Sequence, residues 1–181
     1  MGNSFEEVRI GVFPCRCGVN IAGVIDMEAL TEYSRTLPNV VVAEQNLSLC
    51  TTSGADFIRK YITDFDLNRV VIVACTPKTH EPVFQAVLID CGLDPSYLEF
   101  VNIREHVSFV HQQDEAAALE VAKEQVRAGV SRAVLLEVVP ERVVPVSDSV
   151  LVIGGGVAGL QSALDLSNQG HKVFLVEQGE T

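Results

Sequence analysis

Short apolar runs alternate with amphipathic segments along most of the chain. The apolar runs predict four strands, at residues 8–13, 40–43, 69–74 and 98–101. Apolar residues recur at helical spacing between and after these runs, which predicts helices at residues 25–37, 53–64, 80–91 and 114–128. The second and third strands are continuous β-branched runs, so we expect both to be buried on both faces. The order βαβαβαβα predicts an α/β domain, a Rossmann-like parallel sheet between two layers of helices.

Three residues are expected to define helix ends. Asp26 is placed to cap the first helix, because its carboxylate can accept a hydrogen bond from a free N–H of the first turn. Gly92 follows the third helix and Gly129 the fourth, and glycine most easily adopts the left-handed conformation that ends a helix. We therefore expect the fourth helix to stop before Gly129.

The pattern changes between residues 137 and 148, where two prolines stand in a stretch without helical periodicity. It then restarts with a predicted strand, helix and strand at residues 149–153, 156–169 and 172–176. A single βαβ unit cannot cover both faces of its own sheet. The expected organisation is an amino-terminal α/β domain at 1–136, a linker at 137–148 and the truncated start of a second Rossmann domain at 149–181.

The charge of the chain narrows the classes of partner. Thirteen Lys and Arg against 24 Asp and Glu give a net charge of −11, which repels nucleic acid and anionic membranes. No apolar run approaches the roughly 18 residues of a membrane-spanning helix, and no secretory signal opens the sequence. The expectation is a cytoplasmic protein that neither binds nucleic acid nor inserts into a membrane.

A glycine-rich turn links the strand and the helix of the second segment. Gly154, Gly156 and Gly159 suit a tight turn, a close approach to pyrophosphate and close helix–strand packing, and Glu177 ends the next strand. The free N–H groups of the helix start attract phosphate. These four residues predict an FAD or NAD site in a longer protein, and the alternative is a packed turn that binds no ligand.

Four of the five cysteines follow predicted strands, where a parallel sheet brings its loops together at one edge. They are Cys15, Cys17, Cys50 and Cys75. Four converging thiolates suit a [4Fe–4S] cluster or a structural zinc, and their spacing does not choose between the two. Alternatively, buried cysteines serve as small apolar side chains, which is the interpretation we favour for Cys91. Cys75 precedes a helix, so a reactive thiolate is a further option there.

Several charged residues are predicted at the same edge of the sheet. They are His80, Glu81, Arg104, Glu105 and His106. Such residues can donate hydrogen bonds to cluster sulfurs or tune a reduction potential. They can also simply cap helices and line a solvated rim, and this second interpretation is the one that the sequence favours.

Several motifs resemble the A subunit of heterodisulfide reductase: FPCRCG with the following NIAG, the run from Cys75 to Phe84, NIREH, and VIGGGVAGLQSALDLSNQGHKVFLVE. The likeness extends from Val8 to Glu177. It implies the amino-terminal domain and the start of the FAD domain of an iron–sulfur flavoprotein. Proteins of this family transfer electrons between FAD and [4Fe–4S] clusters, in some cases by flavin-based electron bifurcation. Their partners are other reductase subunits and a hydrogenase or dehydrogenase.

On this chain the resemblance implies that Cys15, Cys17, Cys50 and Cys75 ligate one [4Fe–4S] cluster, with no catalytic residue of its own. It also implies that the glycine turn and its acidic residue contact FAD. One departure is that many relatives read NIREHC, whereas Val107 follows His106 here, which puts the cluster in doubt if that cysteine is a ligand. Two further hypotheses remain open, a docking module without redox activity and a zinc-stabilised domain.

Overall fold

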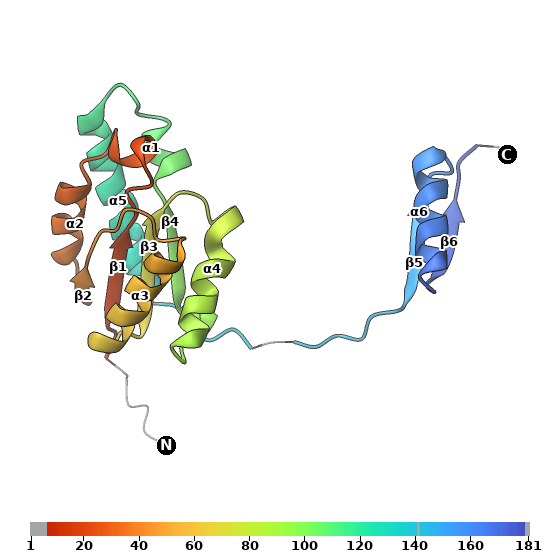
Figure 1. Ribbon diagram of the computed structural model, residues 1–181, viewed down its shortest axis with the longest axis horizontal. Helices are drawn as coiled ribbons and strands as arrows, with labels where there is room; N and C mark the ends of the chain where they lie inside the picture. The colour runs from red at the N-terminus through yellow and green to blue at the C-terminus, as the bar shows by residue number, and fades with distance from the viewer. Residues whose placement is uncertain (1–6, 141, 180–181) are drawn as a thin grey trace, which may run out of the picture. The chain divides into compact units, whose positions relative to one another are not determined.

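The computed structural model describes residues 7–140 and 142–179. The chain divides into two compact units, one up to Val139 and one from Pro140 onward. The residues before Glu7, Glu141 within the predicted linker, and the last two residues lie outside the described part. Each unit is an α/β arrangement of parallel strands, which confirms the predicted fold class (Figure 1).

The first unit contains a four-stranded parallel sheet in the order β2-β1-β3-β4. Its strands are β1 (Ile10–Pro14), β2 (Val40–Ala43), β3 (Arg69–Ala74) and β4 (Leu98–Asn102). The bounds of β2 and β3 are those that the β-branched runs predict. The strand order reverses direction at β1 and β3, so the loops after these two strands flank the crevice where open α/β sheets bind ligands.

Helices cover both faces of this sheet, as the alternating pattern predicts. The helices are α1 (Val19–Ala22), α2 (Met27–Arg35), α3 (Thr52–Asp64), α4 (Pro77–Asp90) and α5 (Glu115–Ala133), with short turns η1 (Pro95–Tyr97) and η2 (Arg104–Ser108). Helices α2 and α5 pack together on one face, and α3 and α4 pack together on the other (Figure 1). Because successive side chains of a strand point to opposite faces, each layer has its own apolar core.

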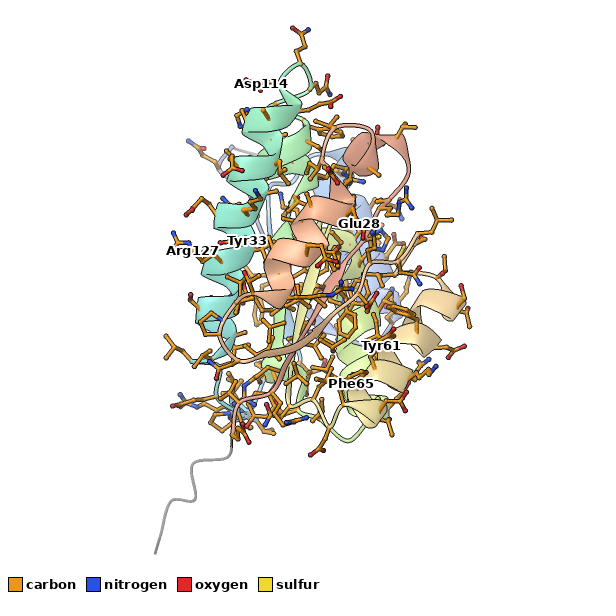
Figure 2. All side chains as sticks on the ribbon, turned by 90° about the vertical axis from the view of Figure 1, so that its left-hand side faces the viewer. Glu28, Tyr33, Tyr61, Phe65, Asp114 and Arg127 are labelled. Carbon is orange, nitrogen blue, oxygen red and sulfur yellow. The ribbon has the colours of Figure 1, made fainter. Side chains whose placement is uncertain are left out.

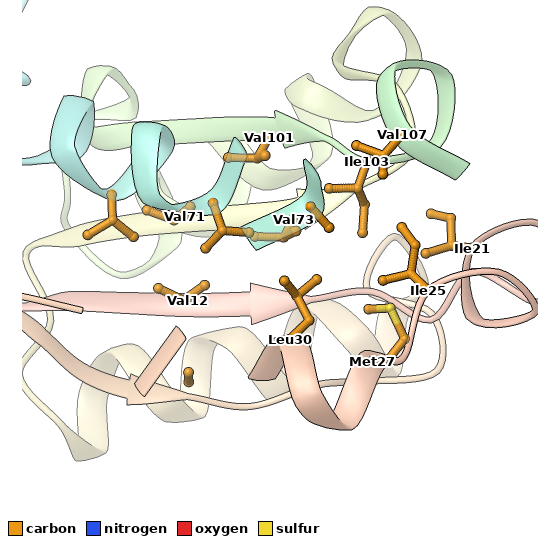
Figure 3. Packing of buried hydrophobic residues seen from close by; sticks show 14 of the residues in the cluster. Val12, Ile21, Ile25, Met27, Leu30, Val71, Val73, Val101, Ile103 and Val107 are labelled. Carbon is orange, nitrogen blue, oxygen red and sulfur yellow. The ribbon is translucent and has the colours of Figure 1, made fainter. Parts of the chain in front are cut away.

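The central strand β3 supplies both cores and is buried at all six positions. Val71 and Val73 pack with Leu30 of α2 under α5, as Figure 3 shows. Val70 and Ile72 point the other way, into the cluster around Phe84 and the helices α3 and α4. The expectation of a strand buried on both faces is therefore confirmed for β3.

The same expectation is wrong for β2. Its residues are mostly half-buried, and Val41 is 37% exposed. The reason is its place in the sheet, because β2 lies at an edge and pairs only with β1. A β-branched run reports a preference for strand but not the position of that strand in the sheet.

Two predicted helix ends are confirmed and one is wrong. The Asp26 carboxylate accepts a hydrogen bond from the N–H of Ala29 at 3.0 Å, and Gly92 follows α4 with φ +77°. Gly129 does not end α5, which continues to Ala133. A Cβ at Gly129 would lie 2.4 Å from Cγ2 of Val101, so the missing side chain allows α5 to approach the sheet. Asp114 caps the start of this helix (Figure 2).

Helix α4 begins earlier than the apolar pattern indicates. Its first residue is Pro77, with Thr76 as N-cap, and not His80. Proline is favoured at the first helical position, where its missing N–H would have no partner in the helix. The difference adds residues 77–79 to the helix, so His80 and Glu81 lie at its fourth and fifth positions and not at its start.

The second unit is one βαβ motif. It consists of β5 (Ser149–Ile153), α6 (Val157–Asn168) and β6 (Lys172–Val176), with parallel pairing from Ser149 and Lys172 to Ile153 and Val176. The described residues between 136 and 148 form neither helix nor strand. Across the part of the chain that the structure describes, no helix combines the length and the apolar character that crossing a membrane requires.

Candidate metal centre and glycine-rich turn

The four predicted ligands all lie at the carboxyl edge of the first sheet. Cys15 follows β1, and its N–H donates to the carbonyl of Val73 at 2.8 Å. Cys75 follows β3 directly. Cys17 stands in the turn before α1 with φ +42°, and Cys50 lies just before α3. Sequence separations of tens of residues are thus brought to one edge of the fold.

The loop at residues 47–50 brings its cysteine towards Cys15. The backbone N–H of Leu49 donates to Sγ of Cys15 at 3.5 Å, and an isolated bridge pairs Cys15 with Asn46. The hydroxyl of Ser48 lies 3.7 Å from Sγ of Cys50. Backbone N–H groups that point at cysteine sulfur are the kind of outer contact that adjusts a metal–sulfur site. The sequence offered no signal for these contacts, since Leu49 acts through its backbone.

Burial and mutual proximity change the acidity of these thiols. Cys15 is 3% exposed, and burial raises its pKa to about 11. Burial also raises the pKa of Cys17, and the neighbouring thiols of Cys75 and Cys50 raise it further, whereas Arg104 lowers it. These mutual effects link Cys17 with Cys75 and Cys50, and Cys15 with Cys17 and Cys50. A metal that binds here must displace protons, which favours loading at higher pH.

An all-cysteine donor set is used both by structural zinc and by a [4Fe–4S] cluster, and the two groups place different demands on it. Zinc held by four cysteines needs every sulfur at about 2.3 Å from one point. Among the described residues, no group of three or more Cys, His, Asp or Glu side chains is placed to hold one ion. A [4Fe–4S] cluster also takes four cysteines but binds them through separate irons, so its ligands surround a larger body. The all-cysteine donor set and the N–H of Leu49 fit that group.

Cys91 lies elsewhere in the unit. It is the C-cap of α4, whereas Cys75 precedes the start of that helix. A helix of 14 residues is about 20 Å long at a rise of 1.5 Å per residue. Cys91 is half-buried against the core cluster of α3 and α4, in agreement with an apolar role.

The NIREH segment forms a π-helical turn that the sequence did not predict. Its i→i+5 hydrogen bonds include Ser108 N–H to the carbonyl of Ile103 at 2.9 Å. The Asn102 side chain accepts from the N–H groups of Arg104 and Glu105 at 3.1 and 3.0 Å. An Asn at the end of a strand commonly accepts such hydrogen bonds from the following backbone, so the sequence indicated a turn here but not its π geometry. Wider π turns are rare and frequently occur at functional sites.

Val107, the departure from the family pattern, is completely buried. It belongs to the apolar cluster of α1, α2 and α5, and Figure 3 shows it beside Ile103 and opposite Ile21 and Ile25. Its side chain therefore contributes to the core beneath the turn.

Two other charged residues of the rim have ordinary surroundings. The carboxylate of Glu81 accepts a hydrogen bond from Gln85 at 3.3 Å, one turn along α4. His106 lines a cavity of about 270 Å³ between β4 and α5, together with Glu99 and Arg132. These placements agree with the solvated-rim interpretation for these two residues.

The glycine-rich turn of the second unit has the geometry of a phosphate-binding turn. Gly154 has φ +108°, and a Cβ at Gly159 would lie 1.8 Å from the carbonyl oxygen of Gly154. Nothing lies within 4 Å of the position that a Cβ of Gly156 would occupy. Gly156 is the N-cap of α6 and provides no side-chain cap. The first N–H groups of α6 are therefore open to an anion, and this turn fits a pyrophosphate.

The carboxylate of Glu177, which directly follows β6, stabilises this turn through hydrogen bonds. One oxygen accepts the N–H of Gly155, and the other accepts from Gln178 and Gly179 at 2.8 and 2.9 Å. A carboxylate has about four acceptor positions, so roughly one remains for a ribose hydroxyl. The sequence predicted that Glu177 contacts the dinucleotide, but it did not predict that its carboxylate accepts hydrogen bonds from the backbone of the glycine-rich turn.

A pH titration tests this role of Glu177. Hydrogen bonds from Gly179, Gly155 and Gln178 hold the pKa of Glu177 below its usual 4.5. The carboxylate form, and the contacts that it makes, should persist at pH 4.5 and be lost only as the pH falls through the lowered pKa. In NMR, the three amide shifts should follow one titration with a midpoint below 4.5. Glu177→Gln should remove it, and a midpoint at or above 4.5 would contradict the assignment.

Comparison with known proteins identifies the family. Residues 149–181 match the family model described as FAD dependent oxidoreductase. Over 97% of its length, the chain is 52% identical to an iron-sulfur A subunit of the CoB–CoM heterodisulfide reductase of Methanopyrus kandleri, and it covers 26% of that protein. The chain belongs to the heterodisulfide reductase A-subunit family. The predicted resemblance is thus confirmed.

Other members of the heterodisulfide reductase A-subunit family match equally broadly. The corresponding iron-sulfur A subunit of Methanocaldococcus jannaschii is 51% identical over 94% of the chain, which covers 26% of that protein. The A subunit of the H₂/formate:CoB–CoM heterodisulfide,ferredoxin reductase of Methanococcus maripaludis is 49% identical over 97%, with 27% covered. The chain therefore spans about a quarter of the length of the curated relatives that it matches.

Proposed function

We propose that this chain is the amino-terminal part of an electron-transferring iron–sulfur flavoprotein. Its first unit holds one [4Fe–4S] cluster through Cys15, Cys17, Cys50 and Cys75. The observation that carries the proposal is the convergence of these four cysteines at the carboxyl edge of the sheet. The names of two relatives, both of which are iron-sulfur subunits, support it.

The residues of the first unit have separable tasks in this proposal. The cluster, when bound, supplies a store for one electron. Cys15 and Cys75, at 3% and 4% exposure, anchor it towards the dry interior, and Leu49 donates its N–H to Cys15. Cys17 and Cys50 are half-buried and lie nearer the rim, which is the side available for electron exchange. No substrate bond is made or broken by these residues.

The second unit contributes the phosphate-binding wall of an FAD site in the longer protein. Gly154, Gly156 and Gly159 shape the turn, and Glu177 holds it and retains an acceptor position for the ribose. Electron bifurcation, other reductase subunits, and a hydrogenase or formate-oxidising partner are part of the proposal for the longer protein. The names of relatives that include H₂ or formate support these partners.

Metal analysis after anaerobic reconstitution tests the proposal. The 181-residue chain is incubated with ferrous iron, sulfide and a thiol reductant, and then separated from unbound metal. We expect a brown protein with about four irons and as many sulfides per chain. A colourless chain that takes up one zinc in competition would favour the zinc-stabilised domain. A well-folded chain that takes up neither metal would favour the docking module and overturn the proposal.

A further inference from the structure

We propose that Arg104, held by Glu105 on the π-helical turn η2, sets the reduction potential of the centre that the four cysteines bind. The inference deepens the proposed function and rests on it. Arg104 is a positioning charge and not a ligand. Its proposed effect is to stabilise the reduced form of the centre.

The backbone places this arginine beside the cysteine edge. Ala74 and Asn102 are register partners at the ends of β3 and β4, and the N–H of Ile103 donates to the carbonyl of Ala74 at 2.9 Å. Cys75 is therefore one residue, and Arg104 two residues, beyond the last paired positions of two neighbouring strands. The turn η2 also contacts α1, which follows Cys17.

Glu105 fixes the direction of the guanidinium group. Nε and Nη2 of Arg104 both donate to Oε1 of Glu105, at 3.1 and 2.8 Å. The other oxygen of that carboxylate is buried and makes no hydrogen bond within the described part of the chain. A buried carboxylate oxygen without a hydrogen bond lowers the stability of the fold, and an exposed ion pair contributes too little to offset that loss. Stability alone therefore does not explain the Arg104–Glu105 pair. Phe109 flanks the same guanidinium, with its ring centroid 5.8 Å from Cζ.

The charge reaches the cysteines electrostatically. Arg104 stands two residues after Asn102, the register partner of Ala74, and Cys75 follows Ala74 directly. The side chain of Arg104 is about one-quarter exposed, so water only partly screens the interaction. Reduction adds one negative charge to the centre, and a nearby fixed positive charge favours that form. Arginine suits this task because it does not lose its proton in proteins.

A redox titration of the reconstituted full chain tests the inference. Arg104→Gln should load the same iron as the unaltered chain, but its reduction equilibrium should weaken about tenfold, which for a one-electron couple is about 59 mV towards lower potential. The titrant is a low-potential chemical reductant that supplies one electron per cluster. The matched control is Arg127→Gln on the outer face of α5, where the arginine pairs with Glu124, and its potential should not change (Figure 2).

A conservative variant separates charge from structure. Arg104→Lys keeps the positive charge without the two-fold donation to Glu105, so its potential should lie between those of the unaltered chain and Arg104→Gln. Full iron loading with an unchanged potential in Arg104→Gln would overturn the inference and leave the proposed function intact. Equal shifts in the Lys and Gln variants would also overturn it, because the effect would not depend on charge. Failure of the unaltered chain to load iron would reject the proposed function and the inference together.

Discussion

Cys75→Ser is expected to abolish stable iron loading, from about four irons per chain to fewer than one after gel filtration. Cys75 directly follows the central strand β3 and is 4% exposed. A neighbouring side chain therefore has little room to take the place of its sulfur as a ligand. A serine hydroxyl remains protonated at neutral pH and is a far poorer ligand for iron than a thiolate. The measurement is iron and sulfide content, together with visible absorbance, after anaerobic reconstitution.

The fold offers a matched control for this variant. Cys91→Ser makes the same chemical change at the other end of α4, about 20 Å away by the rise of the helix. It should retain full iron content and absorbance. Full iron content in both the Cys75 and the Cys91 variant would show that Cys75 is not a ligand. Equal loss in both variants would show that the change acts through general destabilisation, which circular dichroism would report independently.

Gly54→Ala is expected to destabilise the first unit by about 3 kcal/mol, at the upper end of overpacking substitutions. Gly54 is buried in the first turn of α3, and an added Cβ would meet the carbonyl oxygen of Ser48 at 2.3 Å and backbone atoms of Leu49 at 2.6 Å. Backbone cannot rotate away as a side chain can, so the helix and the loop must separate. For a unit of this size the melting temperature should fall by about 10 °C.

The same variant should weaken iron binding, because the displaced loop carries part of the centre. Leu49 donates its N–H to Cys15, and Cys50 follows in the same loop. We therefore expect lower iron content even at temperatures where the variant is folded. Ser53→Ala, an exposed neighbour on the same helical turn, is the control and should change stability by no more than about 0.5 kcal/mol. A Gly54 variant that melts and loads iron like this control would contradict the packing argument.

Local sequence patterns predicted the strands well and the ends of the helices less well. The runs at 40–43 and 69–74 gave strands with the predicted bounds, because β-branched side chains favour extended backbone wherever they lie. The predicted end of α5 at Gly129 was wrong because a glycine that ends a helix and a glycine that permits close packing look the same in the sequence. Only the contact with Val101 distinguishes the two.

The candidate metal centre, too, was predicted from the sequence only in part. The topology of a parallel sheet was sufficient to predict that four cysteines, Cys15, Cys17, Cys50 and Cys75, lie at one edge. It did not predict that Leu49 presents its backbone N–H to a sulfur or that Arg104 stands on a π turn. Backbone donors carry no side-chain identity, and an i→i+5 turn differs from an α turn by a single inserted residue without a compositional signature.

The order of residues along the chain sufficed to indicate the parallel α/β architecture, the two-part organisation, the glycine-rich turn and the family. These properties arise from periodicity, from topology and from short motifs whose parts act near one another. The edge position of β2, the continuation of α5 through Gly129, and the pairing of Arg104 with Glu105 beside the cysteines emerged only from the folded chain. Each of these depends on which distant segments become neighbours, and a linear pattern does not encode the distance or direction of such contacts.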